Sequence, residues 1–109
     1  MGLLADQLST GLWRVVVDET GLTGERRRRA VIQMSSSLRN LGRAQEAATL
    51  LEEELALGDD ALGGAVRAFL AFALVDLGRE REAASLALTA LAEYLPRYNR
   101  SVARYAKAL

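Results

Sequence analysis

The chain has 109 residues, of which half are hydrophobic and 26% are charged, a balance typical of a soluble globular domain with one core. Its 14 basic residues equal its 14 acidic residues, so the overall charge does not favour attraction to nucleic acid. Cysteine and histidine are absent, which excludes disulfides, thiolate or imidazole metal ligands and any triad that uses an imidazole base. We therefore expect a single domain over residues 1–109, with no cofactor and no catalytic activity.

The N-terminal segment allows two interpretations. Leu4, Leu8, Leu12 and Trp13 are spaced as on a helix, whereas residues 15–17 are three β-branched valines that could extend as a strand. A lone strand in a helical chain would lack hydrogen-bond partners, so a helix is favoured. The first residues have neither a basic lead nor a sustained apolar run, and no stretch has membrane-spanning length. We expect a cytoplasmic protein without a membrane segment.

Glycine and proline divide the rest of the chain into five segments with helical periodicity. The expected helices cover residues 25–41, 44–57, 61–77, 79–94 and 97–109. Gly42, Gly58, Gly78 and Pro96 mark their ends, and the Asp59–Asp60 pair is expected to cap the third helix. This third helix is apolar nearly all round, so it must be covered on two faces or present an exposed apolar face. It is the predicted central helix.

An internal repeat relates the two middle pairs of segments. A shift of 36 residues, the separation of Gly42 and Gly78, places residues 41–48 on residues 77–84. The two octapeptides share a Leu-Gly-Arg start and a Glu-Ala-Ala end. Each copy is a helix, a glycine turn and a second helix, which predicts one helical hairpin per repeat. Glycine accepts the left-handed turn conformation, and the small Ala47 or Ala83 lets the paired helices approach closely.

The repeat resembles the tetratricopeptide repeat. Ser35 and Ala71 stand where that family has a small residue, and Leu38 and Leu74 stand where it has a large apolar residue. The positions at which its second helix packs are Ala47, Leu51, Ala83 and Ala90. The resemblance covers roughly residues 25–94. It departs at Glu54, which replaces a family alanine, and at Asp59–Asp60, which replaces a turn proline. Residues 95–109 look like the closing helix of bacterial single-domain members of the superfamily, and such a cap covers the apolar end of a solenoid.

The resemblance implies an all-α solenoid of αα-hairpins in a right-handed superhelix. It would contain about two repeats, with hairpins at residues 25–58 and 61–95, an N-terminal helix and a capping helix at 97–109. Family members bind a peptide or another protein along a concave groove lined by the first helix of each hairpin. The corresponding groove residues here are Arg29, Ile32, Gln33, Ser36, Arg39, Asn40, Ala65, Ala68, Phe69, Phe72, Val75, Asp76, Ser101, Arg104 and Tyr105.

The two phenylalanines of this set allow two interpretations. Phe69 and Phe72 either line the groove or are core residues buried under the N-terminal helix, because aromatic residues at helical spacing are usually packing residues. No carboxylate clamp of the kind found in some family members is expected, since apolar and hydroxyl residues occupy most of its positions. An apolar centre flanked by arginines instead suits a short amphipathic or acidic-hydrophobic segment.

The charge clusters are predicted to be solvated faces. The arginine run at residues 26–29 could meet phosphates, but nearby Glu25 and residues 52–54 can neutralise it. Residues 52–54 and 59–60 are expected to be exposed acids, because neighbouring carboxylates on a helix cannot converge on one ligand. Asp76 stands late in an apolar helix, so it needs water or a basic partner such as Arg39 or Arg43.

The sequence thus predicts a protein-interaction module that is not an enzyme. Self-association is a close alternative, with Trp13 and the central helix covered by a second copy, because two repeats are few for a stable solenoid. An alternative function of a different class is that of a regulator that binds nucleic acid through residues 26–29 and the basic last helix. This helix contains Arg97, Arg100, Arg104 and Lys107.

Overall fold

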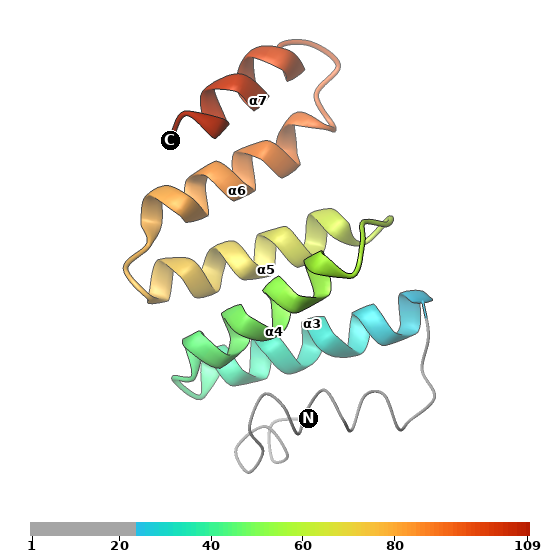
Figure 1. Cartoon of the computed structure of the whole chain (residues 1–109), viewed down its shortest axis with the longest axis vertical. Coiled ribbons are helices and arrows are strands. Elements are labelled where there is room, and N and C mark those ends of the chain that lie inside the picture. Colours follow the sequence, from blue (N-terminus) through green and yellow to red (C-terminus); the bar gives the residue numbers. More distant parts are fainter. Residues whose placement is uncertain (1–23) are drawn as a thin grey trace.

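A computed structural model describes residues 24–109, which form five α-helices and no strand (Figure 1). The helices are α3 (Gly24–Asn40), α4 (Ala44–Ala56), α5 (Gly63–Asp76), α6 (Glu80–Ala92) and α7 (Asn99–Lys107). The predicted all-helical class and the predicted order of these helices are confirmed. The expected N-terminal helix and its strand alternative at residues 15–17 fall on residues 1–23, outside the part that the structure describes.

The helices pair into two hairpins that stack side by side. α3 packs against α4, and α5 packs against both α4 and α6, so the central helix joins the two hairpins. α7 lies on the far side of α6, at the opposite end of the stack from α3 (Figure 1). The arrangement is that of a helical-repeat solenoid, in which each element contacts its neighbours in the chain.

Two glycine turns close the hairpins in the same way. Gly42 and Gly78 have φ angles of 78° and 77°, in the left-handed region that glycine enters without steric cost. In each turn the amide three residues after the last helical residue binds back: Arg43 N donates to the carbonyl of Leu38 at 2.8 Å, and Arg79 N donates to that of Leu74 at 2.9 Å. These bonds satisfy helix-end carbonyls that would otherwise lack partners. The repeat seen in the sequence is therefore a repeat of backbone geometry.

One apolar core runs through both hairpins. It is built from buried residues of α3, α4 and α5, together with Ala83 from α6. The members from α3, α4 and α5 are Val31, Met34, Leu38, Ala47, Ala48, Leu50, Leu51, Val66, Leu70, Ala71, Ala73 and Leu74. Burying a leucine of this kind contributes about 2 kcal/mol. Because α5 lies between α4 and α6, its core-facing side chains serve both hairpins, and neither hairpin buries its apolar face alone.

Two helices start two residues later than the sequence-based boundaries. α5 begins at Gly63 rather than residue 61, and no side chain caps its first turn, so the predicted Asp59–Asp60 cap is wrong. The Asp60 carboxylate accepts from the amide of Leu62, within the connection itself. α7 begins at Asn99 rather than residue 97, after Tyr98, whose φ of 65° places it in the left-handed region.

Candidate functional site

The predicted groove residues all lie at least partly at the surface. Those of α3 and α5 divide into exposed and half-buried side chains, and none belongs to the fully buried core. Exposed members are Arg29, Gln33, Asn40, Ala68, Phe72, Val75, Asp76, Arg104 and Tyr105; half-buried members are Ile32, Ser36, Arg39, Ala65, Phe69 and Ser101. The set therefore contains surface that a partner can reach.

Arg39 links α3 to α5 at this surface. Its Nε donates to Oδ2 of Asp76 at 2.5 Å, and its Nη2 donates to Oδ1 at 3.3 Å. The same guanidinium lies 5.3 Å from the centre of the Phe72 ring, in cation–π geometry. The predicted ion pair between Asp76 and Arg39 is thus confirmed. We call the side chains Arg39, Phe69, Phe72, Val75 and Asp76 the α3–α5 surface.

The two phenylalanines of the α3–α5 surface differ in burial. Phe69 is half-buried against the core, whereas Phe72 keeps 51% of its surface exposed and Val75 keeps 48%. Their rings meet edge to face with centroids 6.1 Å apart. Phe69 therefore supports Phe72 from the core side. The alternative of burial under the N-terminal helix falls on residues 1–23, outside the described part of the chain.

The α7 members of the predicted groove form a separate group. Arg104 lies over the ring of Tyr105, with its guanidinium carbon 5.1 Å from the ring centre. α7 itself packs on α6, where Ser85 Oγ donates to the carbonyl of Ala106 at 2.6 Å. Within residues 24–109, no hydrogen bond, ion pair or ring contact joins Ser101, Arg104 or Tyr105 to the α3–α5 surface.

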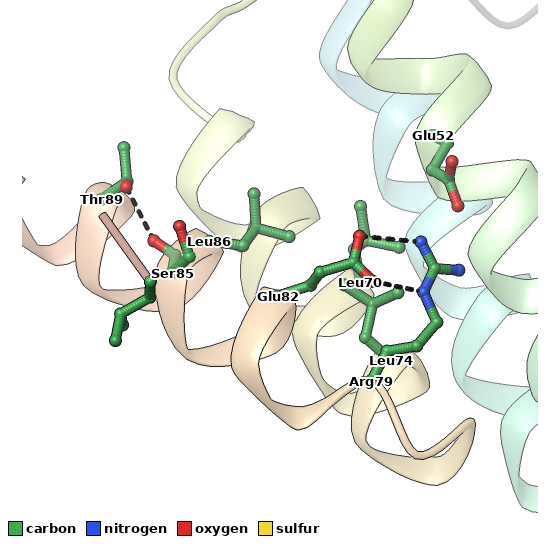
Figure 2. A pocket seen from close by; sticks show the side chains of 9 residues that line it. Glu52, Leu70, Leu74, Arg79, Glu82, Ser85, Leu86 and Thr89 are labelled. Carbon is green, nitrogen blue, oxygen red and sulfur yellow. Dashed lines mark hydrogen bonds and ion pairs between the residues drawn. The ribbon is translucent and has the colours of Figure 1, made fainter. Parts of the chain in front are cut away.

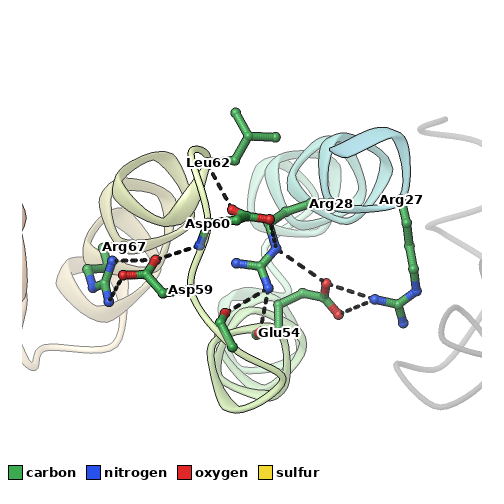
Figure 3. Close-up of polar contacts among 8 residues, drawn as sticks. Arg27, Arg28, Glu54, Asp59, Asp60, Leu62 and Arg67 are labelled. Carbon is green, nitrogen blue, oxygen red and sulfur yellow. Dashed lines mark hydrogen bonds and ion pairs between the residues drawn. The ribbon is translucent and has the colours of Figure 1, made fainter. Parts of the chain in front are cut away.

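A buried charge cluster lies at the other end of the first hairpin (Figure 3). Glu54 is 1% exposed, and both of its carboxylate oxygens accept from Nη1 of Arg27 at 2.8 Å. Nε of Arg28 lies 3.9 Å from Glu54 Oε1. The prediction that residues 52–54 are solvated is correct for the exposed Glu52 and Glu53 and wrong for Glu54. A buried carboxylate needs a partner, and α3 provides two arginines within reach.

Arg28 holds the end of α4 and the connection that follows it. Its Nη2 donates to the carbonyls of Glu54 and Gly58, both at 3.0 Å, and its Nε lies 3.5 Å from Oδ2 of Asp60. The side chain is buried, so the prediction of a solvated arginine run is wrong at Arg28. A guanidinium has donors enough to satisfy several carbonyls at a helix end, where negative partial charge collects.

Asp59 is engaged on the other side of the same connection. Nη1 and Nη2 of Arg67, on α5, each donate to one of its carboxylate oxygens at 3.3 Å. These bonds from Arg67 hold the pKa of the Asp59 carboxyl below its usual range. Arginines of α3 and α5 thus bind the two aspartates that replace a turn proline, and the N-cap position of α5 is Leu62.

Two arginines of the run, Arg26 and Arg29, are exposed. Arg27 binds the carboxylate of Glu54, and Arg28 donates to its backbone carbonyl. Arg29 forms an ion pair with Glu25 at 2.7 Å, which is the predicted neutralisation by a nearby acid. The run therefore does not present four free cations to a phosphate backbone.

The structure also contains a furrow that the sequence did not predict (Figure 2). Its volume is about 380 Å³, and it lies between α4 and α6 with α5 beneath. The lining residues are Glu52, Leu70, Leu74, Arg79, Glu82, Ser85, Leu86, Thr89 and Leu109. The apolar spacing of the sequence indicated the leucines of α5. It does not give the distance between α4 and α6, and this distance leaves the furrow open.

Comparison with protein families identifies the chain. A family model described as a tetratrico peptide repeat matches residues 6–109, nearly the whole chain. The chain belongs to the tetratricopeptide repeat family, as the residues at its helix contacts indicated. Comparison with curated proteins and comparison with solved structures each returned no match. The family consists of protein-interaction repeats, so membership indicates an interaction module.

Within residues 24–109, no helix combines the length and hydropathy needed to cross a bilayer. The same residues include no group of three or more acidic side chains placed to hold a metal ion.

Proposed function

We propose that the protein binds a segment of another polypeptide at the α3–α5 surface, with Phe72 as the apolar anchor. The observation that carries the proposal is the exposure of this ring, together with Val75, on a rigid helix of a repeat fold whose family binds proteins. Aromatic side chains backed by a packed core are the residues on which binding energy concentrates at interfaces.

The contacts of Arg39 refine the kind of segment expected. Asp76 neutralises this arginine, and Glu25 pairs with Arg29, so two of the arginines that flank the phenylalanines already have acidic partners. An acidic segment would compete with these pairs, whereas an apolar side chain meets Phe72 and Val75 without such a cost. We infer an amphipathic segment whose apolar face covers Phe72 and whose polar edge meets the Arg39–Asp76 pair.

The test compares two substitutions of the same kind at equal exposure. Phe72→Glu changes the proposed anchor, and Leu91→Glu changes an α6 side chain that is 50% exposed, against 51% for Phe72. Both variants should keep the far-ultraviolet circular dichroism of the unchanged protein. Proteins captured from native cell extract by the unchanged chain and by Leu91→Glu, but not by Phe72→Glu, are the expected partners.

Titration of the purified captured protein then gives the affinity. Loss of the Phe72 anchor should weaken binding by about thirtyfold or more, the factor associated with an interface hot spot. Equal affinity for Phe72→Glu and the unchanged protein would refute the proposal. Loss of helical structure in Phe72→Glu would place this side chain in the core instead.

Self-association is the second candidate, because α6 and the residues after it expose several large apolar side chains: Leu88, Leu91, Tyr94 and Tyr98. The two candidates are separated by measuring the mass in solution over a range of concentrations. A dimer that dissociates on dilution, and whose formation Leu91→Glu prevents, would support self-association through α6. A monomer at all concentrations would exclude it.

A further inference from the structure

The furrow between α4 and α6 lies on a different side of α5 from the α3–α5 surface. Leu70 and Leu74, which line the furrow, stand two residues before and after Phe72, and two residues on a helix correspond to a rotation of about 200°. A ligand in the furrow would therefore leave Phe72 uncovered. The two places can be tested independently.

The floor of the furrow is apolar and rigid. Leu70 and Leu74 are core residues, and Leu86 is half-buried against the same core. The volume of about 380 Å³ is at the lower end of the range found for ligand sites, enough for a few side chains of a peptide. The floor thus offers a preformed place for an aliphatic side chain.

Several polar groups around this floor already have partners within the protein. Arg79 donates to both carboxylate oxygens of Glu82, at 2.5 and 3.0 Å. The hydroxyl of Ser85 donates to the carbonyl of Ala106, and that of Thr89 donates to the carbonyl of Ser85 at 2.7 Å. Glu82 thus neutralises the one arginine of the lining, and both hydroxyl hydrogens are already used.

Acceptors and negative charge, in contrast, are in excess. The lining includes two glutamates and one arginine, and the arginine is already paired with Glu82. Glu52 projects from α4 toward the furrow (Figure 2), is exposed, and forms no ion pair among the described residues. The pKa of Arg79 is raised by its hydrogen bonds to Glu82 and also by the charge of Glu52. The lining still contains one more carboxylate than guanidinium groups, next to an apolar floor.

We propose that this furrow is a second docking site, which takes a basic, aliphatic segment of a partner polypeptide. An aliphatic side chain of the segment lies on Leu70, Leu74 and Leu86, and a neighbouring lysine or arginine faces Glu52. The charge complementarity at Glu52 distinguishes this segment from the amphipathic segment expected at Phe72.

The experiment uses the full chain and three blocked tripeptides, followed by two-dimensional amide nuclear magnetic resonance. The peptides are acetylated and amidated Leu-Lys-Leu, Leu-norleucine-Leu and Leu-Glu-Leu, which differ in the charge of the central side chain. Leu-Lys-Leu should shift the amide signals of Glu52, Ser85, Leu86 and Thr89. It should bind about three- to fivefold more tightly than the norleucine peptide, the factor expected for one exposed ion pair, and the glutamate peptide should bind least.

Two variants on α4 identify the charge responsible. Glu52→Gln should abolish the preference for lysine over norleucine. Glu53→Gln changes an exposed neighbour that does not line the furrow, so it should preserve the preference. Both side chains are exposed, and neither substitution should alter the fold.

Four results of the peptide experiments would overturn the proposal. These are equal binding of the three peptides, a lysine preference that survives Glu52→Gln, peptide-induced shifts at Phe72 instead of the furrow, and no shifts at millimolar peptide. Concentration-dependent shifts of the furrow signals without peptide would show that a second copy occupies it, and would also contradict the proposal.

Discussion

The two hairpins share their turns and differ at their opposite ends. At the turns, Gly42 and Gly78 have the same backbone conformation, and the following arginines form the same kind of pair: Arg43 with Glu46, and Arg79 with Glu82. Repeat geometry is therefore fixed locally, by a glycine that accepts a left-handed conformation and by an arginine three residues before a glutamate.

At the opposite ends, equivalent positions contain different chemistry. Arg27, Arg28 and Glu54 of the first hairpin correspond to Gly63, Gly64 and Ala90 of the second, at the same shift of 36 residues. In the first hairpin, the half-buried Arg27 binds Glu54, and the buried Arg28 binds the connection to α5. In the second hairpin, a Cβ on Gly64 would lie 3.3 Å from Oη of Tyr94, so the tyrosine ring takes up this space.

The difference shows how a repeat can tolerate an acid at an alanine position. Ala90 is small and apolar, so its burial requires no polar partner. Glu54 can be buried because Arg27 and Arg28, on the neighbouring helix α3, neutralise its carboxylate. The compensation also ties α3 to the connection between the hairpins, since Arg28 reaches Gly58 and Asp60. The first hairpin is joined to the second by charge as well as by apolar packing.

The largest effect is expected for Glu54→Ala. This substitution gives the first hairpin the residue of the second but leaves Arg27 and Arg28 without their carboxylate. Loss of one partner from a buried charge cluster should lower the free energy of unfolding by about 3 kcal/mol. Urea denaturation measures this change. Glu52→Ala, at an exposed position of the same helix, is the control and should change stability by less than about 0.5 kcal/mol. Equal effects of the two substitutions would contradict the role given to the cluster.

An intermediate effect is expected at the turns. Gly42→Ala and Gly78→Ala each place a Cβ at a φ near 78°, and each should destabilise the protein by about 1–2 kcal/mol. No atom lies within 4 Å of either added Cβ, so the loss comes from the backbone and not from a clash. Thermal unfolding of the two variants should give equal losses. A clear difference between them would show that the turns are not equivalent.

The smallest effect is expected from the two arginine–glutamate pairs at the turns. Hydrogen bonds from Arg43 and Arg79 lower the pKa of Glu46 and of Glu82 below the ordinary value of 4.5. A lowered pKa in the folded state adds stability above pH 4.5, and this contribution disappears as the pH falls through the folded value. The double variant Glu46→Gln, Glu82→Gln should therefore lose less stability than the unchanged protein between pH 5 and about pH 3. An unchanged pH dependence in urea denaturation would show that the pairs are not stabilising.

The parts of the structure that the sequence predicted depend on local pattern. Helices and turns follow from apolar spacing and from Gly42 and Gly78, and the partner of Asp76 follows from the cost of leaving a carboxylate unpaired on an apolar helix. The burial of Glu54 depends on which α3 residues face α4, a relation between helices that apolar spacing alone does not give. The available signal was its place at a family alanine position, where burial is the rule.

Of the candidate site, the sequence predicted the elements and not their grouping. Arg39 and Phe72 were both expected in the groove, and the structure brings them into contact. Tyr105 and Arg104 were expected beside them, but α7 packs on α6 and these two side chains contact each other instead. The placement of α7 depends on the connection at residues 93–98, with Tyr98 in a left-handed conformation, which the sequence pattern did not indicate.

The dependence of each hairpin on the other is tested most directly by native-state hydrogen exchange, comparing the unchanged protein with Glu54→Ala. The core amides of α4 and α5 should open with the same free energy, and Glu54→Ala should lower that free energy by the same amount in both helices, because one core serves both hairpins. Loss of protection in α3 and α4 alone, with α5 and α6 still protected, would show that the hairpins fold independently and would contradict the account.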